Sequence, residues 1–164
     1  MHFKSLMHIS FVCNNFEEML DFYGNKLGLK RKVEVKYGEY INRDDRPAMK
    51  EIAKVDPNRI YYVYFEFADG QFVELFPKNE NMEEPVKYGT HNGYNHFALL
   101  VDDINKTYQE FKDKDIKIAA PLSKGPSETY QFWAEDPDGN RFEVMQFTDK
   151  SYQVVGHILW DLVL

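Results

Sequence analysis

The same order of predicted helices and strands occurs twice along the chain, and this internal repeat limits the folds that the chain can adopt. Each half opens with a short apolar stretch that contains a histidine, at 6–12 and at 95–101. A helical pattern follows, and then three strand-like stretches, the last of which contains a glutamate. These four residues, hereafter the quartet, are His8, Glu74, His96 and Glu143. The repeat predicts an α+β fold of two tandem βαβββ modules with curved mixed sheets.

Apolar spacing predicts one amphipathic helix in each half. From Phe16 to Tyr23 the apolar positions recur at i, i+3, i+4 and i+7, which places them on one face of a helix. This helix is expected to begin after Asn14 and Asn15, which are good cap residues, and to close near Gly24. In the second half Asp102 and Asp103 precede the apolar positions, which are Ile104, Tyr108 and Phe111.

Three strands are predicted after each helix. They span 30–35, 59–67 and 71–77 in the first half, and 117–121, 129–134 and 140–147 in the second. The last two strands of each half meet at turn sequences, 68–70 and 136–139, whose Asp and Gly residues suit tight hairpins. Each quartet glutamate therefore belongs to the second strand of a hairpin.

The first half is longer than the second, and most of the excess lies in the polar stretch 37–58. We interpret this stretch as a long loop with one helical turn near 48–53. Loops of this length often act as lids over a binding site. The alternative is that this one is a surface loop without a function. Residues 78–93 are charged and contain a proline and two glycines, so they are expected to link the halves.

The composition argues against several classes of partner. The net charge is −7, which disfavours binding to nucleic acid or to an anionic membrane. Cys13 is the single cysteine, so no disulfide forms within the chain, and we expect an inert buried thiol there. The first residues do not resemble a signal peptide, and the apolar tail from Val154 is too short to span a bilayer. These features predict a cytoplasmic protein whose tail packs on the domain or on another subunit.

The quartet points to a shared divalent metal ion. An imidazole or a carboxylate among apolar neighbours is unfavourable to bury unless it finds a partner. Taken alone, each histidine would be interpreted as a hydrogen-bonded core residue and each glutamate as a solvent-facing strand position. Glu74, however, shares its strand face with Phe72 and Phe76, an unusual setting for a residue in open water. Two imidazoles and two carboxylates in one repeating order therefore favour curved sheets around a metal site.

Two nitrogen and two oxygen ligands suit an octahedral divalent ion. Zn²⁺ and Ni²⁺ are the first candidates, with Co²⁺ and Mn²⁺ as alternatives, and one ion is expected per site. The lack of cysteine ligands favours a catalytic site over a structural one. Four protein ligands leave two positions for water or for two adjacent substrate oxygens, whereas non-haem iron dioxygenases use two histidines and one carboxylate. The ligand set therefore favours proton-transfer chemistry on a small carbonyl compound.

Four segments carry a family resemblance. They are Met7-His8-Ile9, Val73-Glu74-Leu75, Gly93-Tyr94-Asn95-His96-Phe97-Ala98 and 135–143. These segments resemble the vicinal oxygen chelate superfamily, also called the glyoxalase/bleomycin resistance/dioxygenase family, and within it the glyoxalase I (lactoylglutathione lyase) branch. The resemblance covers about residues 5–148. It implies a single domain of this type over 1–150, made of module 1 (5–78) and module 2 (93–148), followed by an apolar tail at 151–164.

The resemblance implies a metal-dependent lyase or isomerase of the glyoxalase I type. Such an enzyme converts the hemithioacetal of methylglyoxal and a thiol to a 2-hydroxyacyl thioester, by proton transfer through a metal-stabilised enediolate. The quartet would hold the metal. Glu143 would be the catalytic base with Glu74 as its catalytic counterpart, and Lys124 would bind the substrate. The resemblance further implies a homodimer, whose metal sites lie within one chain or are shared between two.

Two positions depart from the pattern of bacterial glyoxalase I. An arginine four residues after the first metal histidine is replaced by Val12, and an asparagine four residues after the first metal glutamate is replaced by Lys78. That arginine grips a carboxylate of glutathione in the family, so another thiol adduct or another carbonyl substrate stays open. The alternatives are an epimerase, an antibiotic-modifying thiol transferase or a dioxygenase of the same superfamily, and a non-catalytic antibiotic-binding protein.

Overall fold

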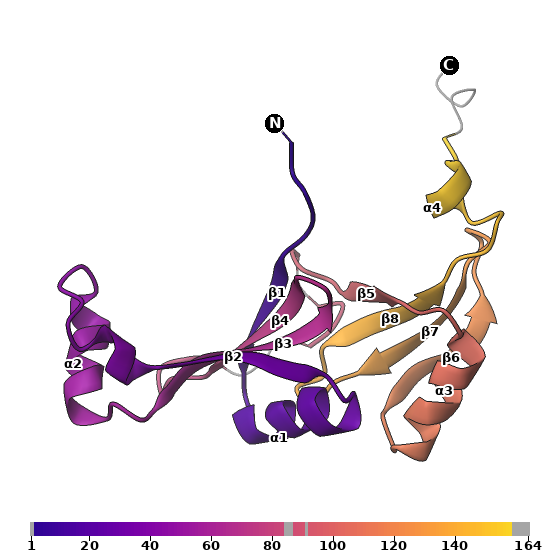
Figure 1. Cartoon of the computed structure of the whole chain (residues 1–164). Coiled ribbons are helices and arrows are strands. Elements are labelled where there is room, and N and C mark those ends of the chain that lie inside the picture. Colours follow the sequence, from indigo (N-terminus) through magenta and orange to yellow (C-terminus); the bar gives the residue numbers. More distant parts are fainter. Residues whose placement is uncertain (1, 84–86, 91, 159–164) are drawn as a thin grey trace. The chain divides into compact units, whose positions relative to one another are not determined.

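The computed structural model describes residues 2–83, 87–90 and 92–158. Two compact units make up the chain, Met1–Pro85 and Val86–Leu164. Each unit contains one four-stranded mixed sheet with its helices, so the predicted α+β fold of two βαβββ modules is confirmed (Figure 1). The boundary between the units falls inside the predicted linker 78–93.

Unit 1 contains a sheet with the strand order β1-β4-β3-β2. Its strands are β1 (His8–Cys13), β2 (Lys30–Lys36), β3 (Ile60–Ala68) and β4 (Gln71–Pro77). β1 pairs with β4 in parallel, and the remaining neighbours pair antiparallel. This topology places the first and the last strand of the module side by side, and with them His8 and Glu74.

Helix α1 (Phe16–Asp21) begins as predicted, because the Asn15 side chain accepts a hydrogen bond of 3.4 Å from a first-turn N–H. The prediction that the helix closes near Gly24 is wrong. The chain continues as a π-helical turn, η1 (Phe22–Lys26). The N–H of Leu27 ends this turn with an i to i+5 bond of 2.8 Å.

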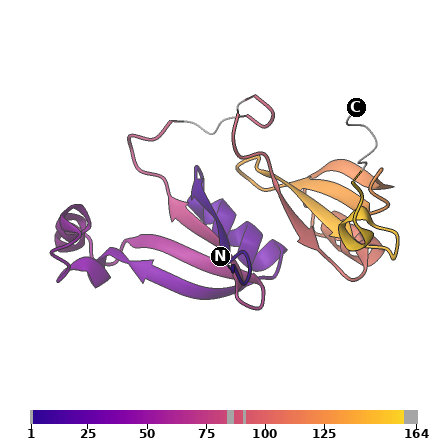
Figure 2. The same cartoon turned by 90° about the horizontal axis from the view of Figure 1, so that it is seen from above.

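Helix α1 covers one face of the unit 1 sheet (Figure 1, Figure 2). Val73 and Leu75 of β4 are fully buried on the helix side, as is Met19 of the helix. Cys13 is buried as well, as expected of an inert thiol. Because side chains alternate along a strand, Glu74 lies on the face opposite to the helix.

The stretch 37–58, hereafter the insertion, is more structured than predicted. It begins with a 3-10 turn, η2 (Tyr37–Tyr40), and continues through a nine-residue helix, α2 (Pro47–Val55). The interpretation as a loop with a single helical turn is therefore wrong. The proline suits the first turn of a helix, and the Lys50 ammonium forms an ion pair of 2.6 Å with Asp44. In Figure 1 the insertion projects beyond the ends of β2 and β3.

Unit 2 repeats the topology of unit 1 with the strand order β5-β8-β7-β6. Its strands are β5 (Phe97–Leu100), β6 (Ile118–Lys124), β7 (Tyr130–Glu135) and β8 (Arg141–Gln146). Helix α3 (Ile104–Asp113) begins at Asp103, whose side chain accepts a backbone N–H at 3.0 Å. On the helix side of the sheet, Phe111 packs edge-on against Phe132 with ring centroids 5.1 Å apart.

The turn 136–139 between β7 and β8 is built around a buried carboxylate. Asp136 accepts hydrogen bonds from the backbone N–H of Asp138 at 3.1 Å and of Asn140 at 2.9 Å. Gly139 has a φ of 81°, in the left-handed region that favours glycine. The turn therefore holds β8, with its quartet glutamate, in register with β7.

The chain after β8 includes a short helix, α4 (Tyr152–Val155). Ser151 ties it to unit 2, because its buried hydroxyl accepts the Thr148 N–H at 2.8 Å. Val154 and Ile158 are 56% and 69% exposed, so the described part of the predicted tail presents apolar side chains to solvent. The last residues of that tail, 159–164, lie outside the described residues. Across the described ranges, every helix is too short or too polar to span a bilayer.

Candidate metal site

The structure brings His8 and Glu74 together on one face of unit 1. Ser10 pairs with Glu74 across the parallel β1–β4 ladder, and His8 lies two residues before Ser10 on the same face. The His8 Nε2 is 3.5 Å from the Glu74 Oε2. The glutamate side chain is 10% exposed and the imidazole 39% exposed, so the carboxylate is covered and the imidazole stands at the surface.

His96 and Glu143 repeat this arrangement in unit 2 with the same register. Ala98 pairs with Glu143 across the β5–β8 ladder, and His96 lies two residues before Ala98. The His96 Nε2 is 3.6 Å from the Glu143 Oε2. β5 begins at Phe97, so His96 directly precedes the strand, which is shorter than the predicted stretch 95–101. The two modules therefore place their His–Glu pairs at equivalent positions of their sheets.

An aromatic ring accompanies each pair, and sequence reasoning missed both rings. Tyr64 pairs directly with Glu74 across β3–β4, and its ring centroid is 5.7 Å from the histidine ring of that unit. Trp133 pairs directly with Glu143 across β7–β8, and its ring lies 4.6 Å from the other histidine ring, edge to face. The residue across from Glu74 could not be found by counting back through the turn, because a register shift between Glu66 and Ala68 moves Tyr64 into the place that Phe65 would otherwise take.

The Nδ1 atoms of both histidines have neighbours, which leaves Nε2 for a ligand. His96 Nδ1 lies 2.5 Å from Asn95 Oδ1, which also accepts the Tyr88 hydroxyl at 3.3 Å. A hydrogen held on Nδ1 by an oxygen leaves the lone pair on Nε2 and makes that nitrogen a better ligand. His8 Nδ1 lies 2.9 Å from Met7 Sδ, a softer acceptor. Asn95 is thus an orienting residue that sequence reasoning missed, although it directly precedes His96.

The phenol of Tyr64 stays protonated beside its carboxylate. Burial raises the pKa of Tyr64 to about 12, and the hydrogen bond with Glu74 and the charge of that carboxylate act in the same direction. The hydroxyl is therefore a hydrogen-bond donor throughout the neutral range. Trp133 occupies the corresponding place beside Glu143 and has no hydroxyl. The two carboxylates consequently have unlike neighbours.

The donor atoms of each pair fit a divalent metal ion. Separations of 3.5 and 3.6 Å exceed an ordinary hydrogen bond. They approach the spacing of roughly 3 Å between neighbouring ligands that each lie about 2.0–2.2 Å from one ion. Two largely buried carboxylates also bring two negative charges, which a divalent cation would balance. Within the described residues of either unit, no group of three or more His, Cys, Asp or Glu side chains is placed to hold a metal, so a four-ligand site needs both pairs.

The other residues singled out from the sequence make local contacts. Lys124 ends β6, the edge strand farthest from β5, and forms an ion pair with Glu128 that raises the pKa of the lysine. Lys78 donates a hydrogen bond from Nζ to Asn14 Oδ1. Val12 lies on the same face of β1 as the quartet histidine and is 50% exposed. The structure therefore brings each quartet histidine to the glutamate of its own unit, and the substrate contact of Lys124 stays a prediction.

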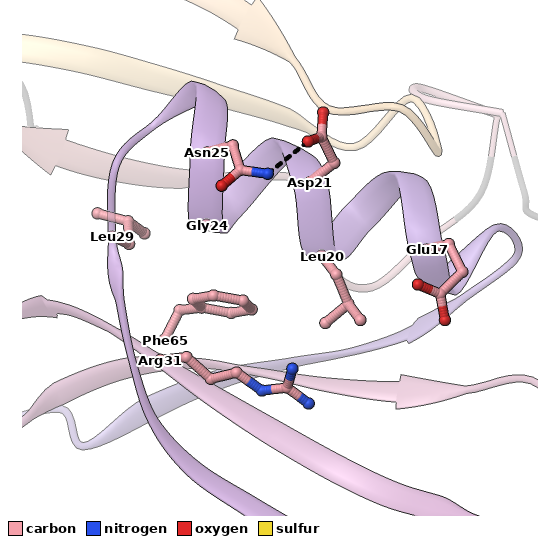
Figure 3. A pocket seen from close by; sticks show the side chains of 8 residues that line it. All are labelled: Glu17, Leu20, Asp21, Gly24, Asn25, Leu29, Arg31 and Phe65. Carbon is pink, nitrogen blue, oxygen red and sulfur yellow. Dashed lines mark hydrogen bonds between the residues drawn. The ribbon is translucent and has the colours of Figure 1, made fainter.

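A hollow lies on the helix side of the unit 1 sheet (Figure 3). This cleft of about 530 Å³ is lined by Glu17, Leu20, Asp21, Gly24, Asn25, Leu29, Arg31 and Phe65. The Asn25 amide donates to the Asp21 carboxylate at 2.6 Å along its helical wall. Phe65 pairs with Val73 and shares its face, which is opposite to that of Glu74. The cleft is thus separate from the metal-ligand pair of unit 1.

Two βαβββ modules that each present a His–Glu pair in one register define a two-module α+β protein with paired candidate metal ligands. The family of this protein is shown by its sequence. The chain belongs to the Glyoxalase/Bleomycin resistance protein/Dioxygenase superfamily, whose model matches residues 5–144. This membership confirms the resemblance on which the expected chemistry rests.

Relatives and solved structures agree with the family. A lactoylglutathione lyase of Neisseria meningitidis is 26% identical over 144 residues, which cover 86% of this chain and 89% of that protein. A probable chloroplastic lactoylglutathione lyase of Arabidopsis thaliana is 25% identical over 148 residues, which cover 87% of this chain but 36% of that protein. The chain thus spans about a third of that longer relative. The glyoxalase family protein from Enterococcus faecalis has the same fold, with a TM-score of 0.65 at 23% identity, covering 88% of this chain and 99% of that one.

Proposed function

We propose that the protein is a metal-dependent lyase or isomerase of the glyoxalase I type. Its substrate would be the hemithioacetal of methylglyoxal and a thiol, and its product a 2-hydroxyacyl thioester. The carbon that bears sulfur loses a proton and the neighbouring carbon gains one, so the atoms balance without an oxidant or a reductant. The observation that supports this proposal is the His–Glu pair repeated in the same register in both units.

The quartet would hold one divalent ion, with Zn²⁺ and Ni²⁺ ahead of Co²⁺ and Mn²⁺. When bound, such an ion polarises two adjacent substrate oxygens and stabilises the negative charge that develops on them. The imidazoles are prepared for this role because Asn95 engages the Nδ1 atom of His96 and Met7 lies against that of His8.

Glu143 is the proposed base that moves the proton, and Glu74 is its counterpart. Glu74 is paired across the sheet with Tyr64, whose phenol can donate a hydrogen bond to it, whereas Glu143 is paired with Trp133, which has no hydroxyl. A carboxylate that is held less firmly can change more readily between binding the metal and accepting a proton. Lys124 is the proposed contact for an acidic group of the substrate, and it would have to leave Glu128 to make that contact.

An assay with methylglyoxal and several thiols tests the proposal. The purified protein is loaded with Zn²⁺ or Ni²⁺, its metal content is measured, and thioester formation is followed with each thiol. We expect turnover that needs both metal and thiol and that disappears after chelation. A protein that binds metal but forms no thioester with any thiol would contradict the proposal.

Val12 favours a second candidate function, another metal-dependent reaction of the superfamily on a different carbonyl compound. Its apolar side chain lies on the face of His8 and offers no charge to a carboxylate of glutathione. An epimerase, an antibiotic-modifying thiol transferase and a dioxygenase are the members of this class. Thiol-independent turnover of a carbonyl compound by the metal-loaded protein would select it. A non-catalytic antibiotic-binding protein has no need of two His–Glu pairs, so they argue against that alternative.

We also propose a homodimer. Each four-stranded sheet has two edge strands, and natural sheets cover or pair such edges. The exposed apolar side chains Val154, Val155 and Ile158 offer a surface for a second copy. If the metal sites are shared between two chains, the His8–Glu74 pair of one chain would bind the same ion as the His96–Glu143 pair of the other chain.

A further inference from the structure

A run of aromatic rings extends from the metal-ligand pair of unit 1 across the same region of the sheet. Its members, hereafter the tyrosine platform, are Tyr37, Tyr40, Tyr61, Tyr62, Tyr64 and Phe76. The Tyr62 ring centroid lies 5.4 Å from that of Tyr64 and 5.4 Å from that of Phe76. All six side chains are half-buried, so each ring keeps part of its surface accessible.

A β-bulge adds Tyr61 to this group. Val35 pairs with Tyr62 and Lys36 pairs with Ile60, so Tyr61 is the extra residue of β3. Its ring centroid is 5.3 Å from that of Tyr62. Consecutive residues of a regular strand point to opposite faces, and bulges re-aim side chains. The bulge therefore explains why two neighbouring tyrosines join one aromatic surface.

The insertion supplies the outer end of the platform. Tyr37 and Tyr40 lie three residues apart on η2, and their ring centroids are 5.1 and 5.5 Å from that of Tyr61. Gly38 allows the close approach of η2 to the end of the insertion, because a Cβ there would meet the Pro57 carbonyl oxygen at 2.8 Å. The insertion thus has a structural role, which is to carry two rings to the end of the sheet.

The part of the platform nearest the metal-ligand pair is uncharged and bordered by carboxylates. Burial raises the pKa of Tyr62, and the charges of Glu74 and Glu39 act in the same direction. The guanidinium of Arg59 lies 5.6 Å from the Tyr37 ring centroid, at the far end. When a divalent ion balances Glu74, Glu39 still disfavours a carboxylate group of a peptide thiol in this region, whereas a neutral ring is not affected.

We propose that the tyrosine platform binds a neutral aromatic ring of the substrate, which makes the thiol adduct of an aryl-substituted 2-oxoaldehyde the preferred substrate class. This inference rests on the proposed function, because the quartet would hold the two oxygens while the ring lies over Tyr62 and Phe76. Ring pairs are favourable at centroid distances of about 4.5–7 Å in edge-to-face or offset geometry. Phenol hydroxyls would add a few directed polar contacts, as in other largely apolar binding sites.

The first test measures ring binding without metal or turnover. Benzamide and acetamide are the probes, since both are neutral and they differ by a phenyl for a methyl group. Each is titrated into the metal-free protein, and the tyrosine ring signals are followed by NMR. We expect benzamide to shift platform signals at concentrations where acetamide does not. Equal effects of the two probes on the platform would overturn the inference, whatever the outcome of any activity assay.

The second test compares phenylglyoxal with methylglyoxal, using one thiol and the metal-loaded protein. We expect kcat/KM to be at least about tenfold higher for the phenylglyoxal adduct. Tyr62→Leu should abolish most of this ratio, and Tyr40→Leu, at the outer end, should reduce it less. Tyr152→Leu is the control, because Tyr152 stacks on His157 of unit 2 at 3.8 Å and lies outside the platform.

The outcomes separate the two proposals. Turnover of methylglyoxal without a preference for phenylglyoxal leaves the proposed function standing and overturns the ring-binding inference. Selective benzamide binding without turnover of either adduct supports the platform and contradicts the glyoxalase I reaction. If Tyr62→Leu changes the molecular mass in solution and leaves the substrate ratio intact, the rings form an interface between copies and the inference is wrong.

Discussion

Tyr64 and Trp133 occupy corresponding positions of the two sheets, each directly across from the quartet glutamate of its unit. Glu74 lies across from the phenol of Tyr64, which raises the number of polar groups beside that carboxylate, whereas the Trp133 ring packs on His96 with centroids 4.6 Å apart. The two modules therefore carry the same candidate ligands, but the residues that surround these ligands differ between the modules. This difference in neighbours is the basis on which we propose Glu143, and not Glu74, as the carboxylate that moves the proton.

Glu143→Gln is expected to remove the base while keeping an oxygen that can bind metal weakly. Turnover should fall by about 10²–10⁴-fold, the usual contribution of general-base catalysis, and metal content should fall much less. Both quantities are measured on the same preparation, and Glu74→Gln serves as the matched variant. If Glu143→Gln turns over normally at full metal occupancy, the base is the other carboxylate.

Loss of a ligand and loss of an orienting group should weaken metal binding to different degrees. Asn95→Ala should reduce metal affinity by roughly 10- to 100-fold, because the Nδ1 atom of His96 loses its acceptor. His8→Ala and His96→Ala should each reduce it further, since an imidazole ligand disappears. His157→Ala, which changes a ring stacked on Tyr152, should bind metal like the wild type. Competition with a coloured chelator measures all four affinities, and unchanged binding in His8→Ala would remove that residue from the site.

Mixed dimers test whether the metal sites are shared between chains. In a shared-site dimer of His8→Ala and His96→Ala chains, one site would carry both substitutions and the other site would carry neither. We expect the isolated mixed dimer to bind metal at one of its two sites and to recover the corresponding activity. A site made within one chain would give the opposite result, because every site would then lack one histidine.

The free energy of unfolding should decrease at acidic pH, because Glu135 becomes protonated and loses its ion pairs. The carboxylate accepts the Arg141 Nε–H at 2.8 Å and pairs with Lys117. Burial alone would raise the pKa of Glu135, but these two cations lower it overall below its ordinary value of 4.5. A carboxyl with a lowered folded pKa stabilises the fold above the unfolded pKa and loses that contribution as pH falls through the folded pKa.

Glu135→Gln should therefore flatten the acid side of the stability profile. We expect the variant to lose about 1–2 kcal/mol of unfolding free energy at neutral pH and to approach the wild type once the pH has fallen through the lowered folded pKa of Glu135. Urea unfolding at several pH values measures this difference. Glu110→Gln, which changes an exposed helix pair with Lys106, is the control and should follow the wild type. An equal loss for Glu135→Gln at every pH would show that packing, not charge, is responsible.

The sheets could be predicted because their signals are local. Alternating side chains and turn residues specify a strand and its hairpin partner over a few positions. The helix of the insertion could not be predicted in full, because its short apolar pattern depends on burial of Ala53 by neighbouring structure. The π-helical turn could not be predicted either; it is closed by local backbone bonds such as the one from the Leu29 N–H to the Tyr23 carbonyl at 3.0 Å, which no apolar spacing indicates.

The candidate ligands could be predicted from the order in which they occur along the chain. The residues around them could not, because these depend on how the strands pair. His8 and Glu74 are distant in sequence, and only the parallel pairing of β1 with β4 shows how close they lie. The bulge that turns Tyr61 onto the aromatic surface leaves no mark in the residue pattern. The proposed assembly of the two pairs into one metal site is a further step that no short residue pattern specifies.

The parallel pairing of β1 with β4 also has a consequence for synthesis on the ribosome. β1 emerges well before its partner, so the sheet of unit 1 closes only after the whole module has been translated. All of its strands lie within Met1–Pro85, and N-terminal units generally fold before later ones are made. A nascent chain would therefore pass through a stage that presents one His–Glu pair without the other. Metal capture should come late, after the second module has left the ribosome, and metal supply should not limit folding of the first.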